Sequence, residues 1–236
     1  MLETINKDTL AVIPLRAGSK GLPGKNLHPF AGKPLYRHAL EQAQRVIGQC
    51  VISTDIPEII QAELPTCCRV VERPAVLAED HTPMTPVLMH LFRILSQEGG
   101  LPKRVVLMQA TSPLRRDQDI RAALSLFDSR KFELVMSVVK ADSGVLKFGF
   151  TENNRFIPIA EPAFCFANRQ SLPEITRPNG AVYVFSPHTF LKNGGLATQS
   201  IGSIEIPSDF SIDIDTHEDL KAAESCFQQN TFSMAS

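Results

Sequence analysis

Residues 16–26 of the sequence, RAGSKGLPGKN, bring cations and evenly spaced glycines into one short stretch. They follow an apolar run, residues 10–15, of the length of one buried strand. Glycines let successive backbone N–H groups converge on one anion, and Arg16 and Lys25 add full positive charge. The spacing is neither that of a P-loop nor that of a dinucleotide-binding fingerprint. The plain alternative is a surface turn with solvated lysines, but three cations directly after a buried strand favour a phosphate-binding loop.

Two aspartates alternate in the segment SIDIDTHEDL near the C-terminus. Because side chains alternate along an extended backbone, the carboxylates of Asp213 and Asp215 are expected to face the same way. Beside a phosphate-binding loop, such a pair suits Mg²⁺, which takes one or two carboxylates together with phosphate oxygens. In the alternative, Asp215 caps the helix expected from about Thr216 and Asp213 pairs with a lysine. The neighbouring loop favours the metal site.

Polar side chains also gather in the turn QATSPLR, where a central strand is expected to give way to a helix. The amide of Gln109 and the hydroxyls of Thr111 and Ser112 could orient a polyhydroxylated substrate. Alternatively, the hydroxyls only satisfy backbone donors of a capped turn. Arg177, in RPNG before an apolar strand, is either part of a turn or a ligand for a carboxylate or phosphate.

The elements that must position these residues alternate between short apolar strands and helices along the first part of the chain. This alternation predicts an α/β fold, with a Rossmann-like, mostly parallel sheet flanked by helices. Parallel sheets bind ligands at the carboxyl ends of their strands. The predicted strand ends carry polar residues, namely Arg16, Asp55, Arg73 and residues 109–112. The site is therefore expected at this edge of the sheet.

The alternation stops between residues 142 and 177, which hold short strand-like pieces and turn signals. We expect this segment to be an insertion that covers the site or forms an oligomer contact. Lys147 and Arg169 lie within it and are solvated surface cations unless the segment folds over the site. The remaining pattern predicts one domain over residues 1–228 and a disordered tail over residues 229–236.

The composition argues against several classes of protein. A net charge of −1 gives no general attraction for nucleic acid. No apolar run approaches the roughly 18 residues of a membrane span, and the first residues lack the apolar core of a signal peptide. Five cysteines without C-x-x-C spacing favour a reducing, cytoplasmic setting over a disulfide framework or zinc site. Zinc and serine hydrolase motifs are absent.

Together these stretches resemble the sialic-acid-activating cytidylyltransferases, the CMP-N-acylneuraminate synthetases. The resemblance covers nearly the whole chain and rests on several motifs in the same order: IPLRAGSKGLPGKN, STD, ERPAVLAED, QATSPLR, RPNGAVYVF and SIDIDTHEDL. Two departures are small, since Leu15 stands where the family usually has a small residue and Ala110 replaces a proline. Neither departure removes a functional group.

The resemblance implies a nucleotidyltransferase-type fold and transfer of CMP from CTP, with Mg²⁺, to the anomeric hydroxyl of a nine-carbon 2-keto sugar acid. It implies catalytic roles for Arg16, Lys25 and Asp213, with Mg²⁺ held by Asp213 and Asp215. It also implies a homodimer formed through the inserted segment 142–177. The nucleotide-binding residues would be Arg16, Gly18, Ser19, Lys25, Asn26 and Arg73. The sugar acid would contact Gln109, Thr111, Ser112, Lys147, Arg169 and Tyr183, with Arg177 as a further candidate.

N-acetylneuraminic acid is the expected acceptor, and legionaminic and pseudaminic acids are the alternatives within the same chemistry. The QATSPLR turn favours the first two over pseudaminic acid. A protein of another class, a CTP-binding module without turnover, is disfavoured because none of the expected catalytic or metal-binding residues has been lost.

Overall fold

The computed structural model describes residues 8–235, and the side chains of residues 8–229. At its centre is a seven-stranded sheet in the order β11-β7-β10-β6-β1-β4-β5. Neighbouring strands run parallel except where β10 pairs antiparallel with β6 and β7. The predicted mostly parallel sheet is confirmed. Its strands are β1 (Thr9–Pro14), β4 (Cys50–Thr54), β5 (Cys68–Glu72), β6 (Arg104–Met108), β7 (Leu134–Ala141), β10 (Ile175–Phe185) and β11 (Ile201–Glu205).

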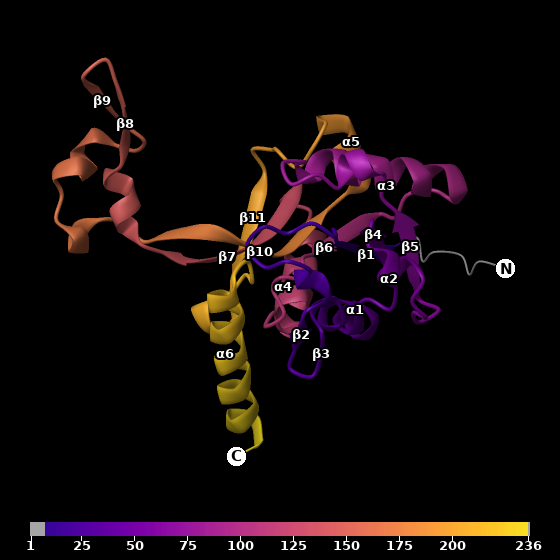
Figure 1. Cartoon of the computed structure of the whole chain (residues 1–236). Coiled ribbons are helices and arrows are strands. Elements are labelled where there is room, and N and C mark those ends of the chain that lie inside the picture. The colour runs from indigo at the N-terminus through magenta and orange to yellow at the C-terminus, as the bar shows by residue number, and fades with distance from the viewer. Residues whose placement is uncertain (1–7, 236) are drawn as a thin grey trace.

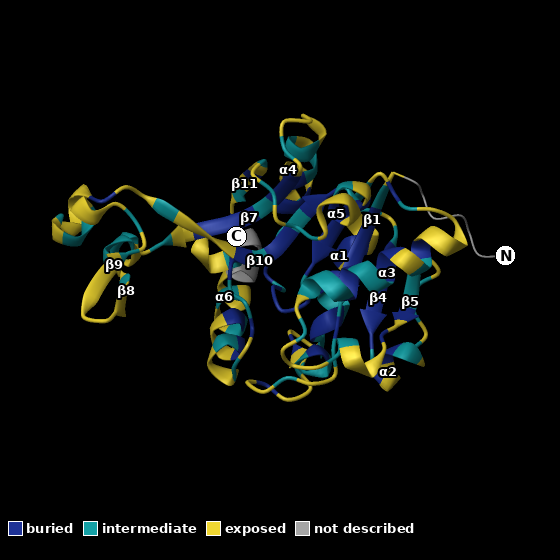
Figure 2. Ribbon diagram, turned by 90° about the horizontal axis from the view of Figure 1, so that it is seen from above, coloured by how far each residue is buried: buried dark blue, intermediate teal, exposed yellow. Residues whose placement is uncertain are grey.

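Helices lie on both faces of this sheet, above and below it in Figure 1, and most of its strands are buried (Figure 2). In β1, Ala11 and Ile13 pack in the core with α1 and α4, whereas Leu10 and Val12 pack with α3 and α5. This division follows from the alternation of side chains along a strand. The helices are α1 (Leu35–Val46), α2 (Pro57–Ile60), α3 (Met84–Glu98), α4 (Asp117–Asp128), α5 (Pro187–Asn193) and α6 (His217–Ala235).

A third apolar cluster ties the loop after β1 to the C-terminal part of the chain. Leu22 and Ile214 are almost completely buried and share this cluster with Leu220 of α6. The small hairpin of β2 (Pro29–Phe30) and β3 (Lys33–Pro34) contributes Phe30. Burial of these side chains therefore holds the predicted phosphate-binding loop against the segment that carries the two aspartates.

Helix α6 continues to Ala235, across most of the tail predicted to be disordered, and residue 236 lies outside the described part of the chain. No glycine or proline occurs between His217 and Ala235 to end the helix. Thr216 caps its start, because its hydroxyl accepts a hydrogen bond from Asp219 N and its N–H donates to the Asp219 carboxylate. The cap proposed for Asp215 is therefore wrong. Within residues 8–235, no helix is long and apolar enough to cross a membrane.

The predicted insertion forms an arm, residues 142–174, that projects from the sheet edge on a ribbon made by the end of β7 and the start of β10 (Figure 1). The ribbon pairs Ile175 with Ala141, so the last part of the predicted insertion belongs to β10. The arm contains the hairpin of β8 (Gly149–Glu152) and β9 (Arg155–Pro158), together with 3₁₀ turns at Ser143–Lys147, Pro162–Phe166 and Arg169–Ser171.

Candidate active site

The glycine loop, residues 16–26, leaves the carboxyl end of β1 and packs against the acidic segment, residues 211–216. A Cβ atom on Gly21 would lie 2.4 Å from the carbonyl oxygen of Asp215, so only glycine permits this contact. Asn26 donates from Nδ2 to the carbonyl oxygen of Arg16 at 2.9 Å and thereby closes the loop. Asn26 is buried and holds the loop together here, rather than presenting its amide to solvent.

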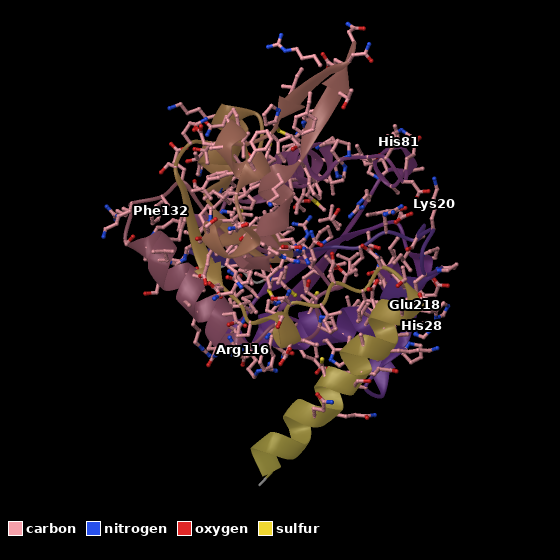
Figure 3. The ribbon with its side chains drawn as sticks, turned by 90° about the vertical axis from the view of Figure 1, so that its left-hand side faces the viewer. Lys20, His28, His81, Arg116, Phe132 and Glu218 are labelled. Atoms are coloured by element: carbon pink, nitrogen blue, oxygen red, sulfur yellow. The ribbon has the colours of Figure 1, made fainter. Side chains whose placement is uncertain are left out.

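These two segments line an open cavity of about 380 Å³ together with the loop that precedes α3. Two of the lining residues, Lys20 on the glycine loop and His81 on the loop before α3, lie near each other on the same side of the molecule in Figure 3. The lining residues are Arg16, Ser19, Lys20, Gly21, Lys25, Asp80, His81, Asp215 and Thr216. Gly18 is exposed and lies beside Arg16 and Asp80 but is not among the residues that line the cavity. The structure thus brings the predicted phosphate-binding cations to one aspartate of the predicted metal pair.

Each cation of the cavity is paired with a carboxylate. Arg16 donates to Asp80, and Lys20 Nζ lies 3.2 Å from the other oxygen of the same carboxylate. Lys25 Nζ lies 2.5 Å from Asp215 Oδ1 and 3.3 Å from the carbonyl oxygen of Ile214. The hydrogen bond from Arg16, with Lys20 in support, lowers the pKa of Asp80. The sequence pattern predicted no role for Asp80, although it lies in the quoted motif ERPAVLAED.

Asp213 lies deeper than Asp215 in the same segment. Burial raises its pKa, the hydrogen bond from Thr111 opposes that rise, and the charge of Asp215 adds to it. Among the described residues, Asp213 Oδ1 is a buried atom without a hydrogen-bond partner. Such an atom, with the exposed carboxylate of Asp215 two residues away, fits a hard cation that completes its coordination with phosphate oxygens and water. In the part of the chain described, no cluster of three or more His, Cys, Asp or Glu side chains forms a metal cage.

The 109–115 turn forms the floor beside Asp213, since Ile214 N donates to the carbonyl oxygen of Thr111 at 2.8 Å. Arg115 holds this turn from below: it is buried and donates to Gln109 O at 3.1 Å and to Ala181 O at 2.7 Å. Burial lowers the pKa of Arg115 to about 10. The Ser112 hydroxyl is 1% exposed and has no hydrogen-bond partner among the described residues. Ser112 therefore does not cap the turn.

Strand β10 closes the opposite wall of this region. Gly180 adopts a positive φ of 78°, and a Cβ there would lie 3.2 Å from Gln109 Oε1. The same Gln109 oxygen lies 3.5 Å from the Thr111 hydroxyl. Burial raises the pKa of Tyr183, as does the charge of Asp213. Asn179 is buried and hydrogen-bonded to Ser137 and Ser211, so its side chain stabilises this wall and is not available to a ligand.

Arg73, at the end of β5, is another buried cation near the glycine loop. Its guanidinium donates to the carbonyl oxygen of Ser53 at 2.8 Å, and only 5% of the residue is exposed. Burial lowers the pKa of Arg73 to about 10, whereas Asp55 opposes the change. Asp55 also accepts from Ala17 N at 2.9 Å. Asp55 thus holds the base of the loop, while Arg73 ties the end of β5 to β4.

None of the residues predicted to contact the sugar acid is among those that line the cavity. Thr111 and Tyr183 lie beside Asp213, whereas three others lie farther away. Lys147 and Arg169 belong to the arm, where Lys147 donates to Ala167 O and Arg169 donates to Asp142 at 2.7 Å. Arg177 is exposed on the ribbon at the base of the arm and donates to its neighbour Pro178. The arm points away from the sheet, so it does not cover the cavity of its own chain (Figure 1).

Comparison with known proteins finds one matching family and several similar chains. A family model described as cytidylyltransferase matches residues 10–234. An N-acylneuraminate cytidylyltransferase of Streptococcus agalactiae is 28% identical over 89% of this chain, and the match spans only 51% of that protein, so the chain covers about half its length. A pseudaminic acid cytidylyltransferase of Campylobacter jejuni is 26% identical, and a CMP-N,N'-diacetyllegionaminic acid synthase of Legionella pneumophila is 28% identical. Both of these matches cover 94% of this chain and 97% of the relative.

Among solved structures, a CMP:2-keto-3-deoxy-manno-octonic acid synthetase complexed with CTP superposes with a TM-score of 0.70. The two sequences are 19% identical, and the match covers 94% of this chain and 99% of that one. At this level of identity the likeness establishes a shared fold.

Proposed function

Because the chain belongs to the cytidylyltransferase family, we propose that it transfers CMP from CTP to the anomeric hydroxyl of a nine-carbon 2-keto sugar acid and releases pyrophosphate. One observation supports this function above all others. The glycine loop and the acidic segment, far apart in the sequence, meet around one cavity through the close contact of Gly21 with Asp215. Lysine and arginine cations thus meet the carboxylate of Asp215 at the carboxyl edge of a mostly parallel sheet, which supports a site for a triphosphate and its metal.

Arg16, Lys20 and Lys25 would hold the triphosphate, with Ser19 and the amide at Gly18 adding hydrogen bonds. When bound at Asp213 and Asp215, Mg²⁺ would supply charge neutralisation at the phosphate oxygens. Phosphoryl-type transfer needs positioning and charge stabilisation more than a covalent catalyst, which fits this set of groups. Arg73 and Asn26 would contact the cytidine portion only after exchanging their internal hydrogen bonds for bonds to the nucleotide, since both are buried in the free protein.

Asp213 is the candidate general base. Its pKa is raised by burial, and such a carboxylate accepts a proton more readily than a solvated one. In the proposed step, the sugar's anomeric hydroxyl gives its proton to Asp213 as its oxygen bonds to the α-phosphorus. The bond between the α-phosphorus and the oxygen that it shares with the β-phosphorus breaks, and pyrophosphate leaves with the electron pair of that bond.

The sugar acid would lie over the 109–115 turn. The unpartnered hydroxyl of Ser112 can hydrogen-bond a substrate oxygen, and Gln109, Thr111 and Tyr183 surround the same place. N-acetylneuraminic acid is our proposed acceptor, and the QATSPLR turn favours it and legionaminic acid alike over pseudaminic acid. Diacetyllegionaminic acid and pseudaminic acid are the acceptors named for two similar proteins, and both are included in the test below.

We also propose that the protein acts as a homodimer joined through the arm. The arm exposes large apolar side chains that a lone chain leaves in water, including Phe148 at 62%, Phe150 at 64% and Phe166 at 91%. In a dimer, Lys147 and Arg169 would reach the sugar acid in the partner's cavity, because they lie far from their own.

The deciding experiment measures pyrophosphate release with CTP and Mg²⁺ and offers the three sugar acids in parallel. Release with any of them supports the transfer, and the ratio of kcat/KM values identifies the acceptor. CTP-dependent stabilisation without release on any acceptor would indicate a CTP-binding module. Absence of both would contradict the proposed function. Sedimentation of the wild-type chain and a Phe166→Ser variant tests the dimer.

A further inference from the structure

Asp80 enters the cavity from the loop before α3 and lies among the cations proposed to hold the triphosphate. We propose that Asp80 is an internal competitor of the polyphosphate: it occupies Arg16 and Lys20 in the free protein and must leave them when nucleotide or pyrophosphate binds. This inference rests on the proposed function of the same cavity. It assigns a role to a carboxylate that the transfer reaction does not itself require.

The charge arrangement is the first argument. The cavity lining holds three lysine or arginine cations, and its two aspartates pair with all three: Asp80 pairs with Arg16 and Lys20, and Asp215 pairs with Lys25. A triphosphate or pyrophosphate carries several negative charges and needs these same donors. Binding must therefore exchange internal ion pairs for pairs with phosphate, which lowers the net gain on binding.

The two carboxylates differ in what they would do after the exchange. Asp215 would leave Lys25 for the metal that accompanies the nucleotide, so its charge stays compensated. Arg16 and Lys20 are the hydrogen-bond and ion-pair partners of the Asp80 carboxylate within the described residues. Asp80 would thus swing away from the phosphates into solvent. Its side chain is already 33% exposed and lies in a loop, so this movement needs no change in the sheet.

A consequence follows for both ends of the reaction. If the paired arrangement dominates in the free protein, apparent affinity for any polyphosphate falls by the fraction of chains with free cations. The same competition helps pyrophosphate leave after transfer, because Asp80 can take its place on Arg16. Asp80 would then weaken binding of substrate and product alike, which is the opposite of what a ligand-contacting residue does.

The test is calorimetric titration of the full-length protein with inorganic pyrophosphate and, separately, with CTP and Mg²⁺. We expect D80N to bind pyrophosphate about three- to tenfold more tightly than wild type, the modest size reflecting a partly exposed pair. D80E, which keeps the charge, should stay close to wild type. The gain of D80N should shrink as salt is raised, since screening already weakens the pair in wild type. In steady state, KM for CTP should fall without a rise in kcat.

The matched control is D128N, which removes the carboxylate partner of Arg104 at the opposite end of the sheet and should leave affinity unchanged. If wild type binds CTP but D80N binds pyrophosphate no more tightly than wild type does, the inference is overturned and the proposed function is not. A wild-type protein that binds neither ligand would overturn the proposed function as well. If D80N folds poorly, D80S provides the same comparison, judged by the same sign of change.

Discussion

The two sides of the candidate site satisfy their polar groups in opposite ways. On the phosphate side, made by the glycine loop, Asp80 and Asp215, every cation has an internal carboxylate partner. On the turn side, made by the 109–115 turn and Asp213, two buried polar atoms have no partner within the described residues. The phosphate side must therefore exchange contacts when a ligand binds, whereas the turn side has hydrogen-bonding capacity left over for it.

The two sides thus represent two ways in which a protein can prepare a site for a ligand. Mobile, partly exposed ion pairs keep cations solvated and replaceable, and each is worth little by itself. Buried unpartnered oxygens cost stability, and a protein keeps them where a ligand is to supply the missing bond. The variants below test the comparison, from the largest expected effect to the smallest.

The largest effect is expected for Asp213→Asn, because an amide cannot accept the proton of the attacking hydroxyl. We expect kcat to fall about 10²–10⁴-fold while CTP affinity changes little, since the phosphate side stays intact. Pyrophosphate release and calorimetric titration with CTP measure the two quantities. Asp209→Asn, an exposed change four residues away, is the control. If Asp213→Asn retained turnover, Asp213 would not be the general base and the turn side would have no part in the chemical step.

Arg115→Met tests whether the turn side is rigid because of a buried cation. The substitution removes the guanidinium donor of Ala181 O and Gln42 Oε1 and leaves Gln109 O only the longer bond from Ser112 N. We expect a loss of about 2–4 kcal/mol in the free energy of unfolding, measured in urea. Arg121→Met, on the exposed side of α4, should cost far less. Equal effects of the two changes would mean that Arg115 does not support the turn.

Gly21→Ala tests the junction between the two sides. The added Cβ would overlap the carbonyl oxygen of Asp215, so the glycine loop or the acidic segment must shift. We expect about 1–3 kcal/mol of destabilisation and a higher KM for CTP. Gly99→Ala is the matched control, since a Cβ there meets nothing within 4 Å. Similar melting temperatures and KM values for the two variants would contradict a tight contact between Gly21 and Asp215.

Much of this arrangement could be predicted from the sequence. The apolar runs and glycine spacing predicted a parallel sheet with a phosphate-binding loop at its carboxyl edge, and the sheet is confirmed. The antiparallel direction of β10 was not predictable, because an apolar run such as AVYVF looks the same in either direction. The helix through Ala235 was missed because a short polar end resembles a disordered tail.

Individual contacts of the site were harder to predict than its position. Asp80 and Arg16 are 64 residues apart, and no local spacing indicates that they pair. Arg115 lies in a turn with substrate-binding character, yet its guanidinium points into the core. Asn26, predicted to bind nucleotide, holds the backbone of Arg16 in the free protein. These outcomes depend on tertiary packing, which the local pattern does not encode.

A subtler prediction concerns Ser112, whose hydroxyl is buried without a partner among the described residues. Ser112→Ala should leave the free energy of unfolding nearly unchanged, because no protein hydrogen bond is lost, while KM for the sugar acid rises about three- to tenfold. Ser211→Ala should do the reverse, since its hydroxyl bonds Asn179 and Ile206 inside the wall. If Ser112→Ala destabilised the fold as much as Ser211→Ala, the turn side would have no spare bonding capacity.

The smallest effect is a pH dependence of stability that comes from Asp213. Burial raises its pKa in the folded chain, so the folded state binds this proton more tightly than the unfolded state does. The free energy of unfolding should therefore decrease as the pH rises through the interval from the unfolded pKa to the raised folded value, and the penalty should persist above it. Asp213→Asn has no such penalty.

The variant should consequently melt at a higher temperature than wild type near neutral pH, and the difference should shrink as the pH falls below the ordinary range of a carboxyl group. Melting curves over a pH series measure this difference in melting temperature, with Asp209→Asn as the reference for the loss of stability that any chain shows in acid. Added Mg²⁺ with CTP should stabilise both chains and narrow the difference between them, because a metal at Asp213 would compensate the buried carboxylate of the wild-type chain. A wild type that melts above Asp213→Asn at every pH without ligand would show that the buried carboxylate is already satisfied. The contrast between the two sides of the site would then be lost.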